Sequence, residues 1–402
     1  MSLPVLPHSA HLLELRTSAD LAAELAAVGE AARPAVEEWE RLRQAVLRLE
    51  KVGPALRTRL GQLAGEADRG LDLFGNGPAV LLTGSCSSLR GLAEALRAGG
   101  QANAAAAIES CLAEGPGEWR WGRRVLDFRA GPHVMGVLNC TPDSFYPASR
   151  QSGLAAALEA ARAMIAAGAR ILDVGGESTR PGSDPVPAGE EIRRVVPVLE
   201  AIRRESEVLL SVDTRKPEVA EAALAAGADI LNDISALRSE RMSAGATGEG
   251  LAALAARHAV PLILMHMRGE PKTMQVEPHY HDVVSEVLAE LAEAVAFATA
   301  AGVERLIVDP GIGFGKRLQD NLCLLKNLPA LRGLGCPVLV GLSRKSFLGA
   351  VTGAPVEERL AATVAGNTLA ILGGAHILRV HDVREAVQAA AVARAVLGAG
   401  CR

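Results

Sequence analysis

Apolar positions in the first part of the chain follow a helical period. Between about residues 12 and 64 they recur every three or four positions, as Trp39, Leu42, Val46 and Leu49 do. This spacing places apolar side chains on one face of a helix. The sequence therefore predicts surface helices in this segment.

A small α/β unit is predicted to follow. A short apolar run indicates a strand over residues 79–83, and two Ala-rich segments indicate helices over 88–98 and 104–112. Gly and Pro residues at 115–117 then interrupt regular structure. We place a domain boundary near Gly117 to Ala130, where this break meets a strand-like segment.

Beyond residue 131 the rhythm changes, because short β-branched or Leu-rich runs alternate with helical segments, as in βαβ units. Many of the helical segments end in Gly, as helices often do. A doubly wound sheet is the alternative, but no run is followed by a GxGxxG turn that opens a helix. Eight such runs lie at 133–139, 169–176, 207–214, 228–235, 260–267, 305–312, 336–343 and 375–382.

Eight strand-helix repeats over this length are typical of a (β/α)8 barrel. The predicted fold class is therefore α/β, a TIM barrel with an N-terminal, mostly helical α/β extension. A chain of 402 residues also exceeds the length of about 250–300 residues at which single cores stop growing. The predicted segments are an N-terminal domain over 1–117, a linker with a barrel-capping strand over 118–130, and the barrel over 131–402.

Composition narrows the function classes. The chain is 49% hydrophobic with a formal net charge of −4 and has no strongly basic stretch, so we expect no nucleic-acid partner. The N-terminus lacks the pattern of a signal peptide, and no apolar run is long enough for a membrane span, so we expect no membrane partner. Six scattered cysteines without a CxxC pair fit reduced thiols and a cytoplasmic location.

The ends of the predicted strands are unusually polar. Active sites of such barrels lie at the carboxyl ends of the strands. Buried carboxylates and amides cost several kcal/mol unless they are satisfied, so a barrel that needed only stability would place aliphatic residues there. Some of these residues could cap loops or pair in the core. The polar residues at or just beyond strand ends are Asn139, Asp173, Asp213, Asn232, Asp233, His266, Arg268, Asp309, Ser343, Lys345, Arg379 and His381.

The set divides into two chemical groups. After the seventh and eighth strands, Ser343, Lys345, Arg379 and His381 supply cations and hydrogen-bond donors suited to phosphate or pyrophosphate. On the third, fourth and sixth strands, short acceptors could instead face a flat heterocycle rich in N–H groups. These acceptors are Asp213, Asn232 and Asp309.

Two long loops punctuated by Gly or Pro follow the first two strands, at 139–145 and 175–182. Loops at a barrel mouth commonly act as lids that exclude water. A plain solvent loop is the alternative. Because each carries several functional side chains, we expect both loops to take part in the site.

At these residues the sequence resembles the dihydropteroate synthase family, a pterin-binding TIM-barrel family, from about Leu126 to the C-terminus. The run from Met135 to Phe145 (MGVLNCTPDSF) and the run from Asp173 to Gly182 (DVGGESTRPG) are similar to the family's two loop signatures. Further motifs follow in the same order: Ser211–Thr214, Asn232–Asp233, Asp309–Lys316, Gly341–Phe347 and Arg379–Asp382.

The resemblance implies a role for each group of residues. Asp213, Asn232, Asp309 and Lys345 would hold a pterin, and Asn139, Arg379 and His381 would bind pyrophosphate, with Mg²⁺ bridging Asn139 and the phosphate oxygens. The p-aminobenzoate pocket, also the sulfonamide site, would be formed by Thr179, Arg180, Pro181, Phe145, Phe314 and Ser343.

The implied reaction is an SN1-like displacement of pyrophosphate from the pterin's hydroxymethyl carbon by the arylamine. Stabilising the leaving group would then be the main task, and no side-chain nucleophile is needed. The resemblance also implies a homodimer formed by barrel helices away from the mouth.

One departure from the family pattern keeps alternatives open. After Phe145 the family usually continues Ser-Asp-Gly-Gly, whereas this chain has Tyr146-Pro147-Ala148-Ser149 and lacks the acidic residue. One alternative is therefore a non-catalytic or regulatory pterin-binding paralogue. A pterin-dependent corrinoid methyltransferase is the other, although it would need no anion site and the chain has no DxHxxG motif.

Overall fold

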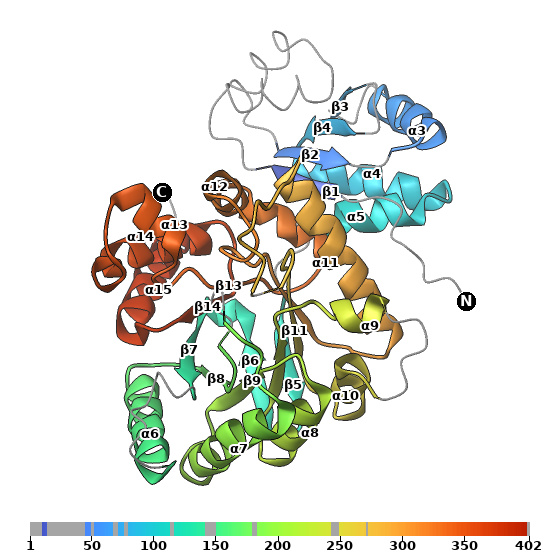
Figure 1. Ribbon diagram of the computed structural model, residues 1–402. Coiled ribbons are helices and arrows are strands. Elements are labelled where there is room, and N and C mark those ends of the chain that lie inside the picture. The colour runs from blue at the N-terminus through green and yellow to red at the C-terminus, as the bar shows by residue number, and fades with distance from the viewer. Residues whose placement is uncertain are drawn as a thin grey trace. The chain divides into compact units, whose positions relative to one another are not determined.

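The computed structural model describes residues 10–13, 45–49, 52–66, 71–75, 79–112, 116–140, 150–178, 183–242, 249–270 and 272–399. Contacts between Cα atoms divide the chain into two compact units (Figure 1). The smaller unit comprises Met1–Gly115 with Lys326–Cys336, and the larger comprises Pro116–Leu325 with Pro337–Arg402. The domain limits expected from the sequence remain predictions.

The smaller unit contains an antiparallel four-stranded sheet. Its strands run in the order β1 (Ala10–Leu13), β2 (Ala45–Leu49), β4 (Val80–Gly84) and β3 (Leu71–Phe74). Its core includes Leu47, Leu60, Leu82, Leu96 and Ile108, all fully buried. Its helices are α3 (Pro54–Ala64), α4 (Cys86–Ala98) and α5 (Ala102–Leu112), and the 3-10 helix η2 (Leu328–Leu334) belongs to the same unit.

The helical prediction is wrong where β2 forms. Leu47 and Leu49 are fully buried and Arg48 between them is not, which is the two-residue period of a strand. Pairing of β2 with both β1 and β4 satisfies its backbone and overrides the helical spacing of Val46 and Leu49. The predicted strand over 79–83 matches β4.

The larger unit is a barrel of eight parallel strands, as the sequence predicts. Hydrogen bonds between neighbouring strands give the order β12-β11-β10-β9-β8-β7-β14-β13, and an isolated parallel bridge between Val308 and Val338 joins the two ends. The strands are β7 (His133–Asn139), β8 (Ile171–Gly175), β9 (Leu209–Asp213), β10 (Ile230–Asp233), β11 (Leu262–Met265), β12 (Leu306–Asp309), β13 (Leu339–Val340) and β14 (Ile377–Val380).

Helices alternate with these strands along the chain (Figure 1). Gly168, Gly227 and Gly302 follow three of the helices with φ near +100°, a conformation that glycine adopts without strain. None of the described helices is long and apolar enough to cross a membrane. The helices are α6 (Arg150–Ala166), α7 (Ala188–Glu205), α8 (Pro217–Ala225), α9 (Arg238–Met242), α10 (Leu251–Arg257), α11 (Val283–Ala300), α12 (Leu318–Lys326), α13 (Ser346–Thr352), α14 (Leu360–Leu372) and α15 (Val383–Leu397), with 3-10 turns η1 (Phe128–Ala130) and η3 (Val356–Glu358).

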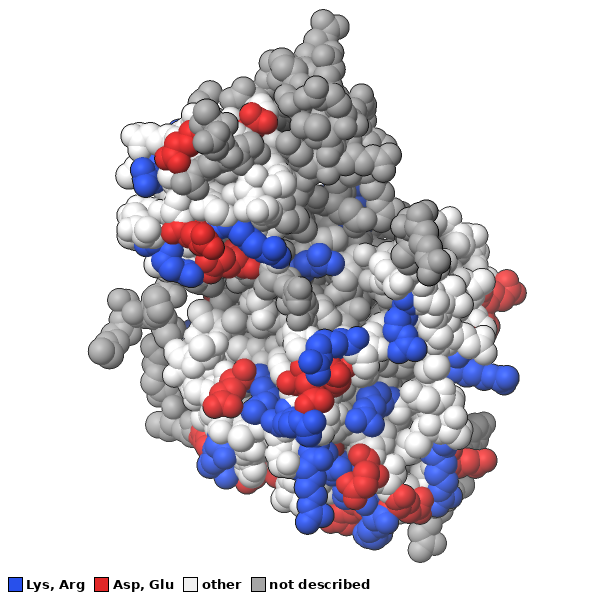
Figure 2. Space-filling view, turned by 180° about the vertical axis from the view of Figure 1, so that it is seen from behind, with Lys and Arg blue, Asp and Glu red and all other residues white. Residues whose placement is uncertain are grey.

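Surface charges on the face shown in Figure 2 are mixed. Lys and Arg side chains lie interspersed with Asp and Glu there, and no large area carries one sign. The surface also carries exposed ion pairs such as Arg162–Glu205 and Arg257–Glu221. Exposed pairs of this kind contribute about 0–1 kcal/mol each, so the fold depends on other interactions.

A hairpin attaches to the amino-terminal ends of the barrel strands. It consists of β5 (Glu118–Trp121) and β6 (Arg124–Asp127). The Trp121 indole N–H donates to Asp229 O at 3.2 Å, and Arg124 Nε donates to Asp229 Oδ1 at 2.7 Å. Asp229 also accepts from Arg203 and, at 2.9 Å, from the backbone N–H of Leu210. This carboxylate therefore joins the hairpin to the barrel.

We expect Asp229→Ala to lower the free energy of unfolding by about 3 kcal/mol, because two guanidinium groups lose a largely buried partner. Urea denaturation followed by circular dichroism measures the change. Glu207→Ala is the matched control, since that exposed carboxylate also pairs with Arg124, and its loss should change stability by less than about 1 kcal/mol. Equal effects in the two variants would contradict the assignment.

Candidate functional site

The carboxyl ends of the barrel strands bring together most of the predicted site residues. Adjacent strands in the sheet place their ends side by side, so residues far apart in sequence meet. The residues so placed are Asn139 on β7, Asp213 on β9, Asn232 on β10, Asp309 on β12, Ser343 and Lys345 after β13, and Arg379 and His381 on or after β14.

Arg379 lies at the centre of one ionic cluster. Its Nε donates to Asp173 Oδ2 at 2.6 Å and its Nη2 to Asp213 Oδ2 at 2.7 Å. The Asn232 amide donates to the same Asp173 oxygen at 3.0 Å. The predicted phosphate-binding cation and two predicted pterin-binding residues thus share one network.

Burial shapes the charge states within this cluster. Burial raises the pKa of the Asp213 carboxyl to about 7, although the nearby Arg379 guanidinium opposes that shift. Burial alone would lower the pKa of Arg379, but Asp173 and Asp213 together raise it above its usual value. Arg379 therefore stays charged, while the charge of Asp213 depends on pH near neutrality.

Asp309 and Lys345 form a second group. Asp309 Oδ1 accepts from the backbone N–H of Gly311 at 2.7 Å, and burial raises the pKa of this carboxyl. The Lys345 ammonium donates to Ile312 O and lies 4.4 Å from the centroid of the Phe314 ring. Burial lowers the pKa of Lys345 to about 8. A lysine with this pKa remains a hydrogen-bond donor for a ligand carbonyl.

Ser343 and His381 meet between the ends of β13 and β14. The Ser343 hydroxyl accepts from the His381 backbone N–H at 3.2 Å and lies 3.1 Å from the His381 Nδ1 atom. His381 is exposed, so its ring can meet an incoming anion. Arg344, by contrast, points away into a two-bond ion pair with Asp382 and adds no charge to the phosphate side.

Four predicted pocket residues lie outside the described residues: Phe145, Thr179, Arg180 and Pro181. The base of the second loop is nevertheless described. Glu177 accepts from the Val186 backbone N–H at 2.9 Å and pairs with Lys216 and Arg215, which follow β9. Glu177 therefore ties the two ends of this loop to each other and to the neighbouring strand end.

The strand ends offer few protein ligands for a metal ion. Among the described residues, no group of three or more His, Cys, Asp or Glu side chains is arranged to hold one. Asn139 ends β7 half-buried, and its amide makes no hydrogen bond within the described part of the chain. One free amide oxygen fits Mg²⁺, which commonly takes most of its ligands from water and phosphate.

Two buried residues near the strand ends were assigned no role from the sequence. Asp173 is fully buried and orients both Arg379 and Asn232, yet a carboxylate two residues before the end of its strand gives no sign of its partners. Lys316 is buried at the end of the glycine-rich loop after β12. The sequence feature that could have indicated Lys316 is its position directly after three alternating glycines, Gly311, Gly313 and Gly315.

Comparisons with known proteins identify the family. A family model described as "Pterin binding enzyme" matches residues 135–381. The dihydropteroate synthase of Escherichia coli K12 is 47% identical over 270 residues, which is 67% of this chain and 93% of that protein.

Solved structures agree with the sequence match. A Xanthomonas albilineans dihydropteroate synthase with 4-aminobenzoic acid is 45% identical, with a TM-score of 0.63 and coverage of 69% of this chain and 97% of that one. A Yersinia pestis dihydropteroate synthase in a sulfonamide drug complex is 40% identical, with a TM-score of 0.64 and coverage of 70% and 100%. The predicted family is thus confirmed: this chain belongs to the pterin-binding enzymes and, among them, to the dihydropteroate synthases.

Proposed function

We propose that this chain condenses 6-hydroxymethyl-7,8-dihydropterin pyrophosphate with p-aminobenzoate, giving 7,8-dihydropteroate and pyrophosphate in folate biosynthesis. The chain is accordingly a transferase. One observation carries the proposal: buried acceptors for a heterocycle, Asp213 and Asn232, share a network with a cation for phosphate, Arg379. A substrate with a pterin at one end and a pyrophosphate at the other matches both halves.

The pterin is held by its edge. Asp213, Asn232 and Asp309 offer carboxylate and amide oxygens to ring N–H groups, and Lys345 donates to the ring carbonyl. In the structure the Asp213 carboxylate accepts from Arg379 instead. When pyrophosphate arrives, its oxygens compete for that guanidinium, which retains Asp173 and releases Asp213 to the pterin.

Pyrophosphate leaves before or as the amine attacks. The bond between the pterin methylene carbon and the phosphate oxygen breaks, its electron pair goes to pyrophosphate, and the methylene cation is stabilised by the electron-rich ring. Arg379, His381 and Asn139 meet the growing negative charge, while Asp309 and Asp213 support the cation. The arylamine nitrogen then forms the new C–N bond and loses a proton to solvent.

Magnesium fits this scheme as a resident ion. Asn139 would hold it together with pyrophosphate oxygens and water, and the ion would neutralise charge on the leaving group. The support comes from the free amide of Asn139 at a strand end close to β14 in the sheet.

The p-aminobenzoate pocket is proposed to lie between the two loops and the segment after β12. Phe314 offers an aromatic face half-buried beside Lys345, and Ser343 offers a hydroxyl. Thr179, Arg180, Pro181 and Phe145 complete the proposed pocket, which also takes sulfonamides.

The proposal includes a homodimer and a cytoplasmic location. A homodimer is supported by exposed apolar side chains on the paired helices α14 and α15, which are Leu369, Leu372, Val392, Val396 and Leu397. Contiguous exposed apolar residues commonly mark an interface. A cytoplasmic location is supported by Cys140 and Cys336, which form no disulfide within the described part of the chain.

We expect purified protein with Mg²⁺ and both substrates to release pyrophosphate, and Lys345→Ala to lower kcat/KM by about 100-fold, since a half-buried, charged donor to the ring is lost. A coupled pyrophosphate assay measures this. Lys326→Ala, at an exposed lysine, is the control and should retain full activity. Pterin binding without turnover in the unaltered protein would favour the non-catalytic alternative, and no pterin binding would refute the site.

The affinity for 6-hydroxymethylpterin should fall below pH 7. Protonation removes the charge of Asp213 and turns one of its acceptor oxygens into a donor, which weakens its bonds to ring N–H groups. Because burial raises its pKa to about 7, binding should weaken as pH falls below that value, by at most about tenfold per unit. Isothermal titration calorimetry from pH 5 to 8 measures the profile. In Asp213→Asn the profile should be flat, and an unchanged slope would show that another group controls it.

We expect the double variant Val392→Glu with Val396→Glu to be monomeric while the unaltered chain is dimeric, because like charges would face each other across the pairing surface. Size-exclusion chromatography with light scattering gives the mass of each. A dimer that survives both substitutions would place the interface elsewhere.

A further inference from the structure

The five consecutive carbonyl groups from Gly311 to Gly315 all accept hydrogen bonds from side chains. This segment follows β12 and carries Phe314 at the proposed p-aminobenzoate pocket. The donors are Lys316 to Gly311 O (2.9 Å), Lys345 to Ile312 O, Gln275 Nε2 to Gly313 O (2.8 Å), Lys316 to Phe314 O (3.1 Å) and Tyr280 Oη to Gly315 O (3.0 Å).

The backbone of this segment requires its glycines. Gly311, Gly313 and Gly315 have φ values of 62°, 88° and 60°, in the left-handed region. A Cβ atom at Gly311 would lie 1.8 Å from His266 O, and one at Gly315 would lie 2.2 Å from Arg268 O. The segment is therefore seated tightly against the strand end after β11. Without regular secondary structure of its own, it depends on side chains for its shape.

Lys316 is the central donor. Its buried ammonium has three protons and three acceptors at or below 3.1 Å, namely Gly311 O, Phe314 O and His266 Nδ1. Because His266 Nδ1 accepts, the neutral ring carries its proton on Nε2, which lies 3.3 Å from Glu290 Oε2. Burial, with the charge of Lys316, lowers the pKa of His266 to about 4, which keeps the ring neutral.

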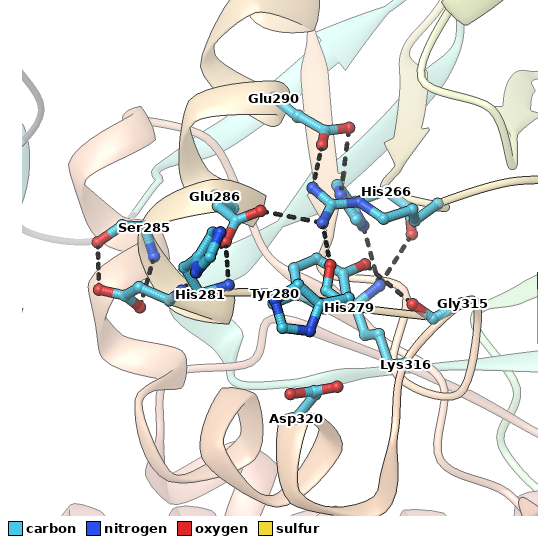
Figure 3. A network of polar contacts seen from close by, with 12 residues as sticks. His266, His279, Tyr280, His281, Ser285, Glu286, Glu290, Gly315, Lys316 and Asp320 are labelled. Atoms are coloured by element: carbon cyan, nitrogen blue, oxygen red, sulfur yellow. Dashed lines mark hydrogen bonds and ion pairs between the residues drawn. The ribbon is translucent and has the colours of Figure 1, made fainter. Parts of the chain in front are cut away.

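A second layer supports these donors (Figure 3). Glu286 and Glu290 on α11 each accept from Arg268, at 2.9 and 2.8 Å. The Arg268 guanidinium lies 3.9 Å from the centroid of the Tyr280 ring, and it thereby fixes the side chain whose hydroxyl reaches Gly315 O. Helix α11 is thus connected to the glycine segment through Arg268 and Tyr280.

We infer that Lys316 is a positioning residue of the reaction: by holding the carbonyls on both sides of Ile312 and Gly313, it fixes the Phe314 ring against which p-aminobenzoate packs. The inference rests on the proposed function. The pterin-binding residues Asp213 and Asn232 stand on other strands and hydrogen-bond to Arg379 and Asp173. Asp309 and Lys345 hydrogen-bond to the glycine segment at Gly311 N and Ile312 O rather than at Phe314, so the larger effect is expected on p-aminobenzoate.

A pH effect follows from the same geometry. Burial lowers the pKa of Lys316 to about 7, with Asp309 and Glu290 opposing and Lys345 and Arg268 adding to the shift. The neutral amine has two protons for three acceptors, so one carbonyl or ring nitrogen loses its partner above that pH. The KM for p-aminobenzoate should therefore rise as pH increases from 7 to 9.

The test is steady-state kinetics on Lys316→Met, a substitution that keeps chain length and removes the donors. We expect the KM for p-aminobenzoate to rise at least tenfold, the KM for the pterin pyrophosphate to change by less than about threefold, and the rise in KM above pH 7 to disappear. Arg317→Met is the matched control, since it removes the adjacent positive charge. The Arg317 guanidinium pairs with Asp320 and donates weakly to Tyr280 O at 3.4 Å but to none of the five carbonyls, so both KM values should stay unchanged.

Each outcome decides the inference. If Lys316→Met is active with the KM for p-aminobenzoate within twofold of normal, or if both KM values rise equally, the inference is overturned. If the variant does not fold, Tyr280→Phe replaces it: losing one bond to Gly315 O should raise the KM for p-aminobenzoate about threefold, and no change would overturn the inference. An unaltered protein without turnover would refute the proposed function instead.

Discussion

Charge buried at the barrel mouth must be paired, and this constraint organises the site. An isolated ion in a protein interior is several kcal/mol less stable than in water, so Arg379 on β14 requires Asp173 on β8 and Asp213 on β9, which lie beyond β7 in the sheet. The partners are 206 and 166 residues away in sequence and meet only in a closed parallel sheet. The polar site therefore exists only when the barrel has formed.

The same pairing prepares the site for its ligand. A phosphate oxygen is as good an acceptor for a guanidinium as a carboxylate, so an anion can replace Asp213 at Arg379 without leaving a cation unpaired. Asp173 holds Arg379 and Asn232 throughout, since both bonds go to one of its oxygens. In the proposed reaction these side chains would be oriented before the ligand arrives, and binding would exchange their hydrogen-bond partners, an arrangement that favours both affinity and rate.

The sequence predicts those structural features that follow from the spacing of apolar and polar residues along the chain. Eight apolar runs between helices define the barrel, and the rule that sites lie at carboxyl ends finds Asp213, Lys345 and Arg379 without coordinates. It does not find the role of Asp173, because the partners of a buried carboxylate are set by strand register. It gives a helix at β2, because Val46 and Leu49 fit a helical period until the sheet pairs their backbone.

Carboxylates pair with cations at both ends of the barrel, but the pairing serves stability at one end and ligand binding in the proposed function at the other. At the amino-terminal ends of the strands, Asp229 is saturated by Arg124, Arg203 and a backbone N–H, so it has no capacity left for a ligand. At the carboxyl ends, within the described residues, Asp213 accepts from Arg379 alone, and Lys345 donates to one carbonyl and faces an aromatic ring. Incomplete pairing is what distinguishes a binding site from a structural ion cluster. The glycine segment held by Lys316 combines both cases. Each of its five carbonyls accepts a hydrogen bond from a side chain, as in a structural cluster, while the Phe314 ring stays available to contact a substrate.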